Sequence, residues 1–284
     1  MNVDTPVWFI TGCSSGLGLE LAKAVLARGW RAVLPARHPE ELTDLASDYD
    51  CRAFPVQLDV TDQASIGAAV IQAEAHFGRI DVLVNAAGYG YLAAIEEGED
   101  AAVRAQFETN VFGLLAVTKR VLPGMRARRS GYIVNFSSLG GLVAFAATGY
   151  YHATKFAVEA LSESLSHEVK PLGIKVIIIE PGAFRTEWAG RSMVDSPTVI
   201  ADYAETAGKR REATRSVSGK QPGDPARAAN AIIAAVQADD PPLRLLLGAG
   251  AYKVALGRLD ALRGNFEAWR ETTLSADFPE NGGA

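Results

Sequence analysis

The sequence contains little cysteine, no excess of positive charge and no long hydrophobic run. Its two cysteines, Cys13 and Cys51, provide neither a disulfide framework nor metal-ligand spacing, which is typical of proteins in a reducing cytosol. Lys and Arg number 28 against 33 Asp and Glu, and the net charge of −5 disfavours contact with nucleic-acid phosphates. No apolar stretch approaches the ~18 residues of a membrane span, and Asp4 lies too close to the first apolar run for a signal peptide. We therefore expect a cytoplasmic protein without metal, nucleic-acid or membrane partners.

The sequence does contain a regular alternation of short apolar runs with longer segments of helical periodicity. Apolar residues make up 48% of the 284 positions and charged residues 21%, as in soluble proteins with a sizeable core. Strands buried on both faces read as continuous apolar runs, and the alternation indicates right-handed βαβ crossovers. We predict a single α/β domain over residues 1–284, of Rossmann type, with a doubly wound, parallel, seven-stranded sheet and helices on both faces. The expected strands are 7–10, 32–34, 54–58, 82–84, 132–135, 176–179 and 243–247, and the clearest helices 17–27, 64–77, 107–125 and 154–169.

Two segments depart from this alternation. Residues 187–223 are polar with scattered large apolar side chains, and a long insertion between a strand and a helix is typically a lid or binding loop. We expect a substrate loop here, with a disordered surface loop as the alternative. Inside it, the three consecutive cations 209–211 are assigned to a solvated helix face, with attraction of an anionic substrate as the alternative. Residues 249–284 form a C-terminal extension with helical character.

Three glycines, Gly12, Gly16 and Gly18, follow the first apolar run and lead directly into a helical segment. Glycine permits a left-handed backbone and close approach to a pyrophosphate, while the helix N-terminus supplies N–H donors and a positive dipole. A plain tight turn is the alternative, but a position between the first strand and first helix favours phosphate binding. With Thr11 in front, the spacing G-x-x-x-G-x-G resembles the T-G-x-x-x-G-x-G motif of the short-chain dehydrogenase/reductase family.

Other segments resemble motifs of the same family, in the expected order, between roughly residues 5 and 250. Residues 85–88 resemble N-N-A-G with Ala86 in place of the second Asn, and Asp59 is similar to the family's aspartate beside the adenine ring. Residues 151–155 reproduce Y-x-x-x-K, and residues 181–186 match the P-G-x-x-x-T stretch that holds the nicotinamide carboxamide. The N-terminal half resembles the steroid- and retinol-dehydrogenase-like branch. The resemblance implies a nicotinamide-dependent oxidoreductase.

The predicted site residues lie in the glycine turn and at the carboxyl ends of the expected strands. The predicted catalytic residues are Asn110, Ser138, Tyr151 and Lys155. The predicted contacts with the dinucleotide are Gly12, Ser14, Ser15, Gly16, Leu17, Gly18, Arg37, Asp59, Val60, Asn85, Ala86, Gly88, Tyr151, Lys155, Pro181, Gly182, Phe184 and Thr186.

Tyr151 and Lys155 are four residues apart, so on a helix both side chains share one face. A phenol has a reference pKa of about 10, and a nearby ammonium favours the phenolate. We therefore expect Lys155 to lower the pKa of Tyr151 and to hold the nicotinamide ribose. Ser138 would donate to the substrate oxygen, and Asn110 would anchor a water that connects Lys155 to solvent. Without the other motifs, this Tyr and Lys would indicate an ordinary surface pair.

Two pairs of adjacent residues require a choice. Ser137 and Ser138 alternate faces of a strand, so only one can point into the site, and the family's spacing to the tyrosine selects Ser138. Tyr150 precedes Tyr151, but only Tyr151 has a lysine four residues later. Tyr150 is assigned to packing or to a contact on the substrate side.

The choice between the two nicotinamide cofactors depends on the end of the second strand. Folds that prefer NAD place an acid there to bind the ribose 2′-hydroxyl. Ala36 stands at that position, Arg37 follows it, and the first acid is Glu40. A guanidinium suits a 2′-phosphate, so we predict NADP over NAD. The alternative is that Arg37 covers the adenine in an enzyme that accepts either cofactor.

Large apolar side chains near the expected cleft suggest a bulky, hydrophobic alcohol or ketone, or else simply anchor the loop. They are Tyr89, Tyr91, Trp188, Met193, Val199, Ile200 and Tyr203. The resemblance also implies a homodimer or homotetramer formed through the helices that hold Asn110 and Tyr151. Two other functions stay open: a dinucleotide-binding sensor or scaffold without turnover, and an epimerase or dehydratase of the extended branch. The first would be expected to lose its catalytic residues, and the second to need a larger C-terminal domain.

Overall fold

A parallel seven-stranded sheet forms the centre of the molecule in the computed structural model, which describes residues 5–190 and 192–278. The strand order is β3-β2-β1-β4-β6-β7-β9, so the chain moves outward from β1 in one direction, returns, and continues outward from β4. The prediction of a doubly wound seven-stranded sheet is confirmed. Its strands are β1 (Val7–Thr11), β2 (Arg31–Ala36), β3 (Ala53–Gln57), β4 (Val82–Asn85), β6 (Gly131–Phe136), β7 (Ile174–Pro181) and β9 (Arg244–Leu247).

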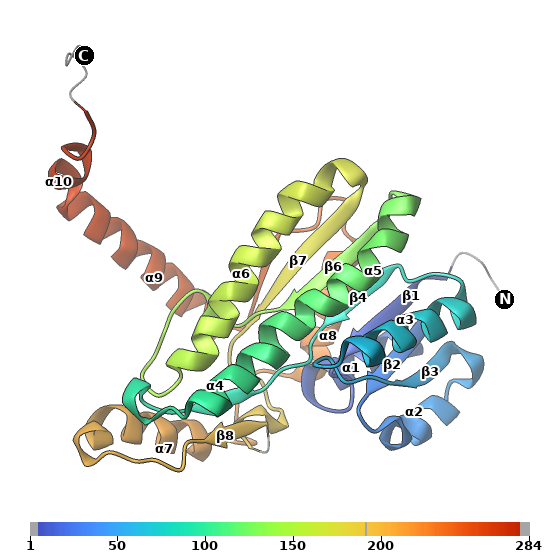
Figure 1. Cartoon of the computed structure of the whole chain (residues 1–284), viewed down its shortest axis with the longest axis horizontal. Helices are drawn as coiled ribbons and strands as arrows, with labels where there is room; N and C mark the ends of the chain where they lie inside the picture. The colour runs from blue at the N-terminus through green and yellow to red at the C-terminus, as the bar shows by residue number, and fades with distance from the viewer. Residues whose placement is uncertain (1–4, 191, 279–284) are drawn as a thin grey trace.

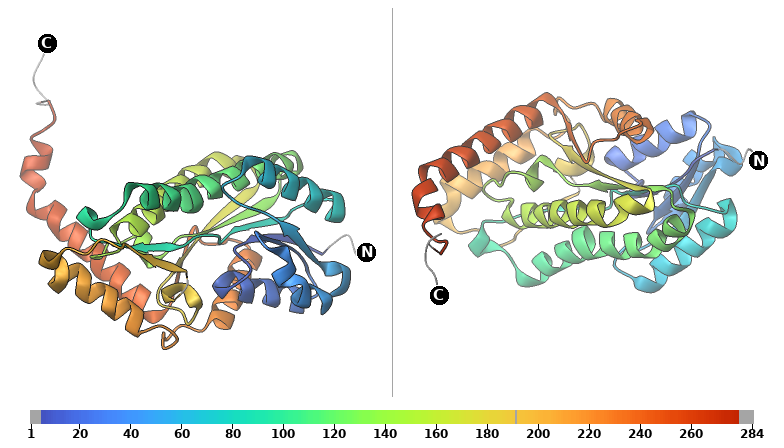
Figure 2. Two further views of the ribbon diagram at one scale, coloured as in Figure 1. Left: turned by 60° about the horizontal axis from the view of Figure 1, so that its bottom comes forward. Right: turned by 90° about the horizontal axis from the view of Figure 1, so that it is seen from above.

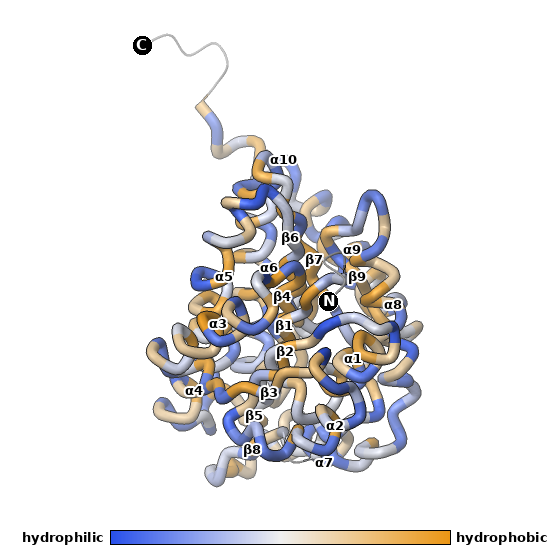
Figure 3. Tube along the Cα trace, turned by 90° about the vertical axis from the view of Figure 1, so that its right-hand side faces the viewer, coloured by the Kyte–Doolittle hydropathy of each residue, from blue (hydrophilic) through white to orange (hydrophobic). Residues whose placement is uncertain are grey.

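Helices cover both faces of this sheet (Figure 1). On one face Leu21 of α1 and Ile232 of α8 pack into one apolar core, and on the other Ile66 of α3 and Val117 of α5 pack into a second. Figure 2 shows the two helical layers, and Figure 3 shows the strands as the most apolar part of the chain between them. The helices are α1 (Gly16–Ala27), α2 (Thr43–Ser47), α3 (Gln63–Phe77), α4 (Asp100–Phe107), α5 (Leu114–Arg128), α6 (Gly149–Val169), α7 (Lys209–Ser216), α8 (Pro225–Gln237), α9 (Ala249–Ala268) and α10 (Arg270–Leu274).

Three regions differ from the sequence-based expectation. The helix expected at 107–125 begins earlier, as α4, and is interrupted by the π-helical turn η4 (Glu108–Gly113) before α5. The helix expected at 154–169 begins at Gly149, so α6 includes both tyrosines. Residues 187–223 contain regular structure, namely α7 and the strand β8 (Met193–Asp195), which pairs in parallel with β5 (Gly90–Leu92).

Candidate active site

The glycine turn between β1 and α1 packs against the end of β4. Gly12 and Gly16 have left-handed backbones, with φ of 67° and 60°. A Cβ on Gly12 would lie 2.7 Å from the Ala86 carbonyl, and one on Gly18 would lie 2.3 Å from the Gly12 oxygen. Side chains at Gly12 and Gly18 would therefore collide with backbone, and at Gly12 and Gly16 they would also strain it.

The first turn of α1 has its N–H groups free of any side-chain cap. Its N-cap residue Ser15 makes no capping hydrogen bond, and the turn contains no acid. By contrast, α3 and α8 are capped by the carboxylates of Asp62 and Asp224. An uncapped N-terminus behind a glycine turn suits an anion such as a pyrophosphate. Ser14 is exposed at this edge, while Ser15 and Leu17 are half-buried.

Thr11 joins this turn to the end of β4. Its hydroxyl donates to the Val84 carbonyl at 3.2 Å and accepts from the N–H groups of Ala86 and Ala87 at 3.1 and 3.2 Å. These bonds use only the backbone of residue 86, so the replacement of the family's Asn by Ala86 leaves the turn held in place.

Asp59 and Arg37 lie close together beyond the ends of β3 and β2. The backbone N–H and hydroxyl of Thr61 bond the Asp59 carboxylate at 2.9 and 2.7 Å. These bonds, together with the charge of Arg37, hold the pKa of Asp59 below its usual value. Arg37 follows β2 directly and is exposed. Val60, next to Asp59, places its carbonyl against Gly113 of η4.

The Asn85 side chain faces away from the turn, into a buried polar network. Its amide donates to Thr118 at 3.0 Å and to Asn135 at 2.9 Å, and Asn135 donates onward to Ser162 at 2.9 Å. This network ties β4 and β6 to α5 and α6. The predicted contact of Asn85 with a dinucleotide can therefore come only from its backbone.

Asn110 lies in the π-helical turn η4, and both its amide nitrogen and its amide oxygen have hydrogen-bond partners. It donates to the Tyr89 carbonyl at 2.9 Å and to the Thr154 hydroxyl at 3.1 Å, and it accepts from the Tyr89 N–H at 3.0 Å. The π turn brings Asn110 to α6 and to the segment after β4. A Cβ on Gly88 would lie 3.0 Å from the Asn110 amide oxygen and 3.8 Å from Lys155 Nζ.

Tyr151 and Lys155 share a buried face of α6, and Ser138 at the end of β6 meets them there. The ammonium of Lys155 donates to the Phe136 carbonyl at 2.7 Å and lies 5.7 Å from the centre of the Tyr151 ring. Burial lowers the pKa of Lys155 to about 8, although the charge of Glu159 acts to raise it. Ser138 is half-buried and also accepts from the Gly140 N–H at 3.0 Å.

The expectation that Lys155 lowers the pKa of Tyr151 is wrong when the groups of the protein alone act on the phenol. Burial raises the pKa of Tyr151 to about 12, and only a hydrogen bond with Ser138 acts against this. The reason is that desolvation of the enclosed phenol outweighs an ammonium that faces the ring. The phenol is therefore neutral at neutral pH.

Residues 181–186 return the chain from β7 to the glycine turn. Pro181 ends β7, the Gly182 N–H donates to the Leu247 carbonyl at 2.9 Å, and Phe184 pairs with Gly223. Thr186 then lies beside the glycine turn, since a Cβ on Gly16 would be 3.6 Å from the Thr186 Cβ.

Trp188 lies over the tyrosine at the other side of the site. Its ring centre is 5.1 Å from that of Tyr151, and Met193 of β8 packs beside Gly90. Tyr150 faces elsewhere: its hydroxyl donates to the Ile95 carbonyl at 2.5 Å and its ring packs on Gly98. These contacts are packing contacts, one of the two roles that the sequence left open for Tyr150.

Glu97 anchors residues 187–223 to the body. Its buried carboxylate pairs with Arg211 of α7, accepts from the Ile200 N–H at 2.9 Å and from the Ala94 N–H at 2.8 Å. Burial acts to raise the pKa of Glu97, but these donors together hold it below its usual value. Lys209 and Arg210 are exposed, as the assignment of 209–211 to a solvated face expects, although the Arg210 guanidinium lies 4.6 Å from the centre of the Phe145 ring. The assignment is wrong for Arg211, which is half-buried and pairs with Glu97.

Sequence reasoning missed a buried acidic pair below the site. Arg244 Nε lies 3.2 Å from Glu159 and 3.5 Å from Glu180, while its terminal nitrogen binds the exposed Glu163 at 2.8 Å. Burial, together with the charge of Glu159, raises the pKa of Glu180 to about 8. Glu159 follows Lys155 by one helical turn, which was the only signal available in the sequence.

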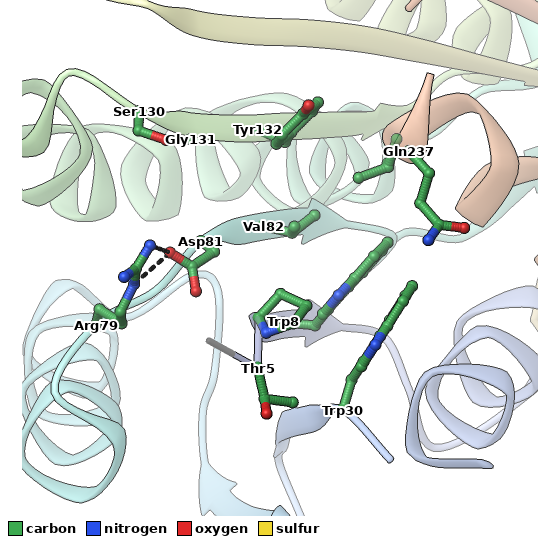
Figure 4. A pocket seen from close by; sticks show the side chains of 12 residues that line it. Thr5, Trp8, Trp30, Arg79, Asp81, Val82, Ser130, Gly131, Tyr132 and Gln237 are labelled. Carbon is green, nitrogen blue, oxygen red and sulfur yellow. Dashed lines mark hydrogen bonds and ion pairs between the residues drawn. The ribbon is translucent and has the colours of Figure 1, made fainter. Parts of the chain in front are cut away.

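A cavity of about 460 Å³ lies at the amino ends of the strands, opposite the residues above. Figure 4 shows its stacked indoles, Trp8 and Trp30, whose ring centres are 5.9 Å apart, and the Arg79–Asp81 ion pair. Asp81 also accepts from the Val7 N–H at 2.9 Å, so it ties β1 to the start of β4. Ligands of doubly wound sheets bind at the carboxyl ends of the strands, so this cavity is separate from the candidate active site.

Comparisons with known proteins agree with this geometry. The family model for short chain dehydrogenases matches residues 6–195. Oxidoreductase BOA17 of Botryotinia fuckeliana is 42% identical over 273 residues, which cover 96% of this chain and 99% of that protein. A crystal structure of a short-chain dehydrogenase from Streptomyces avermitilis superimposes with a TM-score of 0.92 at 43% identity, covering 98% of this chain and all of the other. A short chain dehydrogenase from Burkholderia cenocepacia in complex with NADP gives a TM-score of 0.72 at 25% identity, covering 94% and 98% of the two chains.

The chain belongs to the short-chain dehydrogenase/reductase family of oxidoreductases. Within the described ranges 5–190 and 192–278, no cluster of three His, Cys, Asp or Glu side chains could hold a metal ion. No helix in the same ranges is long and apolar enough to span a membrane.

Proposed function

We propose that this protein transfers a hydride between NADP(H) and an alcohol or carbonyl substrate. The observation that carries the proposal is the meeting of Ser138, Tyr151 and Lys155 at the carboxyl end of the sheet, beside an uncapped helix N-terminus behind a glycine turn. The glycine cradle, Asp59, Arg37 and residues 181–186 would hold the dinucleotide. A bound nicotinamide supplies or accepts the hydride.

The protein's own residues handle the proton. Ser138 fixes the substrate oxygen by a hydrogen bond, and Tyr151 gives its phenolic proton to that oxygen during carbonyl reduction. A phenol that is neutral at neutral pH suits this acid role. Lys155 stabilises the phenolate that results, and Asn110 holds Tyr89 and Thr154 in place around it. Alcohol oxidation would use the same groups in reverse.

Preference for NADP rests on the end of β2. Ala36 is its last residue, exposed Arg37 follows, and the charge of Arg37 reaches Asp59. A planar guanidinium binds a 2′-phosphate in two places at once. We expect a higher kcat/KM with NADPH than with NADH, and the double variant Ala36→Asp with Arg37→Ala should reverse the preference. A wild-type preference for NADH would contradict this assignment.

The substrate is proposed to be bulky and hydrophobic. Trp188 covers Tyr151, and Tyr89, half-buried, lies beside Asn110. Residues 187–223 act as the substrate loop in this proposal, anchored through Glu97. A screen of NADPH oxidation with steroid, retinoid, aryl-ketone and keto-ester substrates tests the class. Hydrogen exchange in residues 187–223 should slow when NADP and a substrate analogue bind, and unchanged exchange would remove their role as a lid.

Association into a homodimer or homotetramer is proposed through the helices that hold Asn110 and Tyr151. Phe112 of η4 and Phe156 of α6 expose 54% and 43% of their surface, which gives this face exposed apolar anchors. The proposed location is the cytoplasm, since Cys13 is a buried free thiol and Cys51 an exposed one. Equilibrium ultracentrifugation of Phe112→Ser with Phe156→Ser should show a smaller assembly than wild type, and an unchanged mass would remove this interface.

A further inference from the structure

Helix α9 extends out of the body of the molecule and continues into α10 (Figure 1). Of its 20 residues only Ala251 and Ala255, near the start, are buried. Large apolar side chains beyond that point are exposed: Leu259 by 60%, Phe266 by 66% and Trp269 by 62%. Apolar surface of this extent on a helix indicates an interface.

Five apolar residues of α9, together with Trp269 directly after it, are spaced as in a coiled coil, while the exposed Val254 and Leu256 lie off this spacing. The six residues follow one another in alternating steps of three and four residues, which places them on one seam of the helix. The seam consists of Tyr252, Ala255, Leu259, Leu262, Phe266 and Trp269. It begins where α9 packs on the body, through buried Ala255, and continues past it, so the outer part is suited to another helix of the same pattern.

Charges along the arm are divided between its two halves. Residues 252–265 carry three cations, Lys253, Arg258 and Arg263, and one anion, Asp260. Residues 266–278 carry three anions, Glu267, Glu271 and Asp277, and one cation, Arg270. Two arms placed antiparallel bring the cationic half of each beside the anionic half of the other, whereas parallel arms bring like charges together. Helices that bind membrane surfaces instead have a polar face rich in Lys and Arg.

We propose that α9 and α10 pair with the same helices of a second copy of this chain, antiparallel and about a two-fold axis. The pairing is isologous, which means that the same seam residues of both chains form the interface. It is independent of the hydride chemistry and of the proposed interface at Phe112 and Phe156.

The first test measures the mass of the full-length protein by light scattering and ultracentrifugation. Leu259→Glu with Phe266→Glu places charges in the seam and should halve the mass of the wild-type assembly. Ala261→Glu is the matched control, because it lies two residues beyond Leu259 on the other side of α9 and is exposed. It should keep the wild-type mass. Both variants should keep the fold of the single chain, measured by circular dichroism, since the changed side chains are exposed within one chain. Equal masses for the seam variant and the wild type would overturn the proposal.

The second test fixes the orientation, in a Cys51→Ser background that removes the exposed thiol. Mild oxidation of a mixture of Tyr252→Cys and Trp269→Cys chains should give cross-linked heterodimers. Efficient cross-linking of Tyr252→Cys alone would overturn the antiparallel arrangement. Sedimentation with phosphatidylcholine and phosphatidylserine vesicles should leave the protein in solution, and vesicle binding that requires Leu259 and Phe266 would assign the seam to a lipid surface instead.

Discussion

Helices α6 and α9 have almost equal lengths, 21 and 20 residues, but opposite relations to the rest of the molecule. Helix α6 buries polar side chains, among them Tyr151, Lys155 and Glu159, while α9 buries only two alanines and exposes its large apolar residues. Burial of polar groups is costly unless they are partnered, and exposure of apolar groups is unfavourable unless they are later covered. Helix α6 therefore holds polar groups in fixed positions inside the protein, whereas α9 presents apolar side chains that another surface can cover.

The buried polar groups of α6 are partnered from several elements. Thr154 accepts from Asn110, Ser162 accepts from Asn135, and the His152 ring accepts from the Phe145 N–H at 3.1 Å. Burial, with the nearby Arg210, lowers the pKa of His152 to about 4, so the ring stays neutral and can accept. These contacts hold the helix in one rotation relative to the sheet, which is what a positioned Tyr151 and Lys155 require.

The largest expected contrast comes from removing one lysine of each helix. Lys155→Met should lower turnover by at least the ~10²-fold typical of losing an acid–base partner, and should weaken NADPH binding as well. Lys253→Met, on the exposed surface of α9, should leave both unchanged. Steady-state kinetics and calorimetric titration with NADPH measure the two effects. Equal behaviour of the two variants would remove the distinction between the helices.

A smaller contrast concerns pH and the buried acid below α6. The pKa of Glu180 is about 8 in the folded protein against 4.5 ordinarily, so the native state holds a proton that the unfolded chain releases between these values. Stability from this group is therefore lost as the pH rises across that window. The free energy of unfolding of Glu180→Gln, relative to wild type, should increase from pH 5 to pH 8.

The control for this prediction is Glu163→Gln, which removes the exposed partner of the same Arg244. The pKa of Glu163 is lowered, chiefly by its hydrogen bond with Arg244, so its contribution to stability is lost only as the pH falls below the ordinary value of 4.5, and the Glu163→Gln difference from wild type should stay constant from pH 5 to pH 8. Urea unfolding at several pH values measures both variants. A pH-independent difference between Glu180→Gln and wild type would show that Glu180 is ionised throughout.

The smallest contrast uses two helical glycines with open space around them, Gly67 of α3 and Gly257 of α9. Alanine is favoured over glycine in helices by roughly 0.5–1 kcal/mol. Gly67→Ala should raise Tm by about 1–2 °C. Gly257→Ala should raise it less, because α9 packs on the body only through its first turns. Equal shifts in calorimetry would mean that α9 unfolds together with the sheet.

The parts of the molecule that the sequence predicted are those with local signals. The seven strands are continuous apolar runs, and the glycine turn, Ser138, Tyr151 and Lys155 stand in short motifs. The π turn at Asn110 has no such signal, and Asn110 bonds Tyr89, 21 residues away. The Glu97–Arg211 pair joins residues 114 positions apart.

Sequence spacing is misleading where the surroundings of a residue determine its state. Lys155 four residues after Tyr151 suggested a lowered phenol pKa, but burial, which a sequence does not show, dominates. The assignment of Arg211 to a solvated face is wrong because its acidic partner, Glu97, belongs to another element. Tertiary contacts determine both cases.

The measurement that tests the central assignment most directly compares turnover of Tyr151→Phe and Tyr150→Phe with NADPH and a reducible ketone. Both changes remove one hydroxyl with little change of volume, and both lie in α6. Tyr151→Phe should lose about 10²- to 10⁴-fold in kcat while still binding NADPH. Tyr150→Phe should lose little, because its hydroxyl only bonds the Ile95 carbonyl. An active Tyr151→Phe enzyme, or equal losses in both variants, would contradict the account.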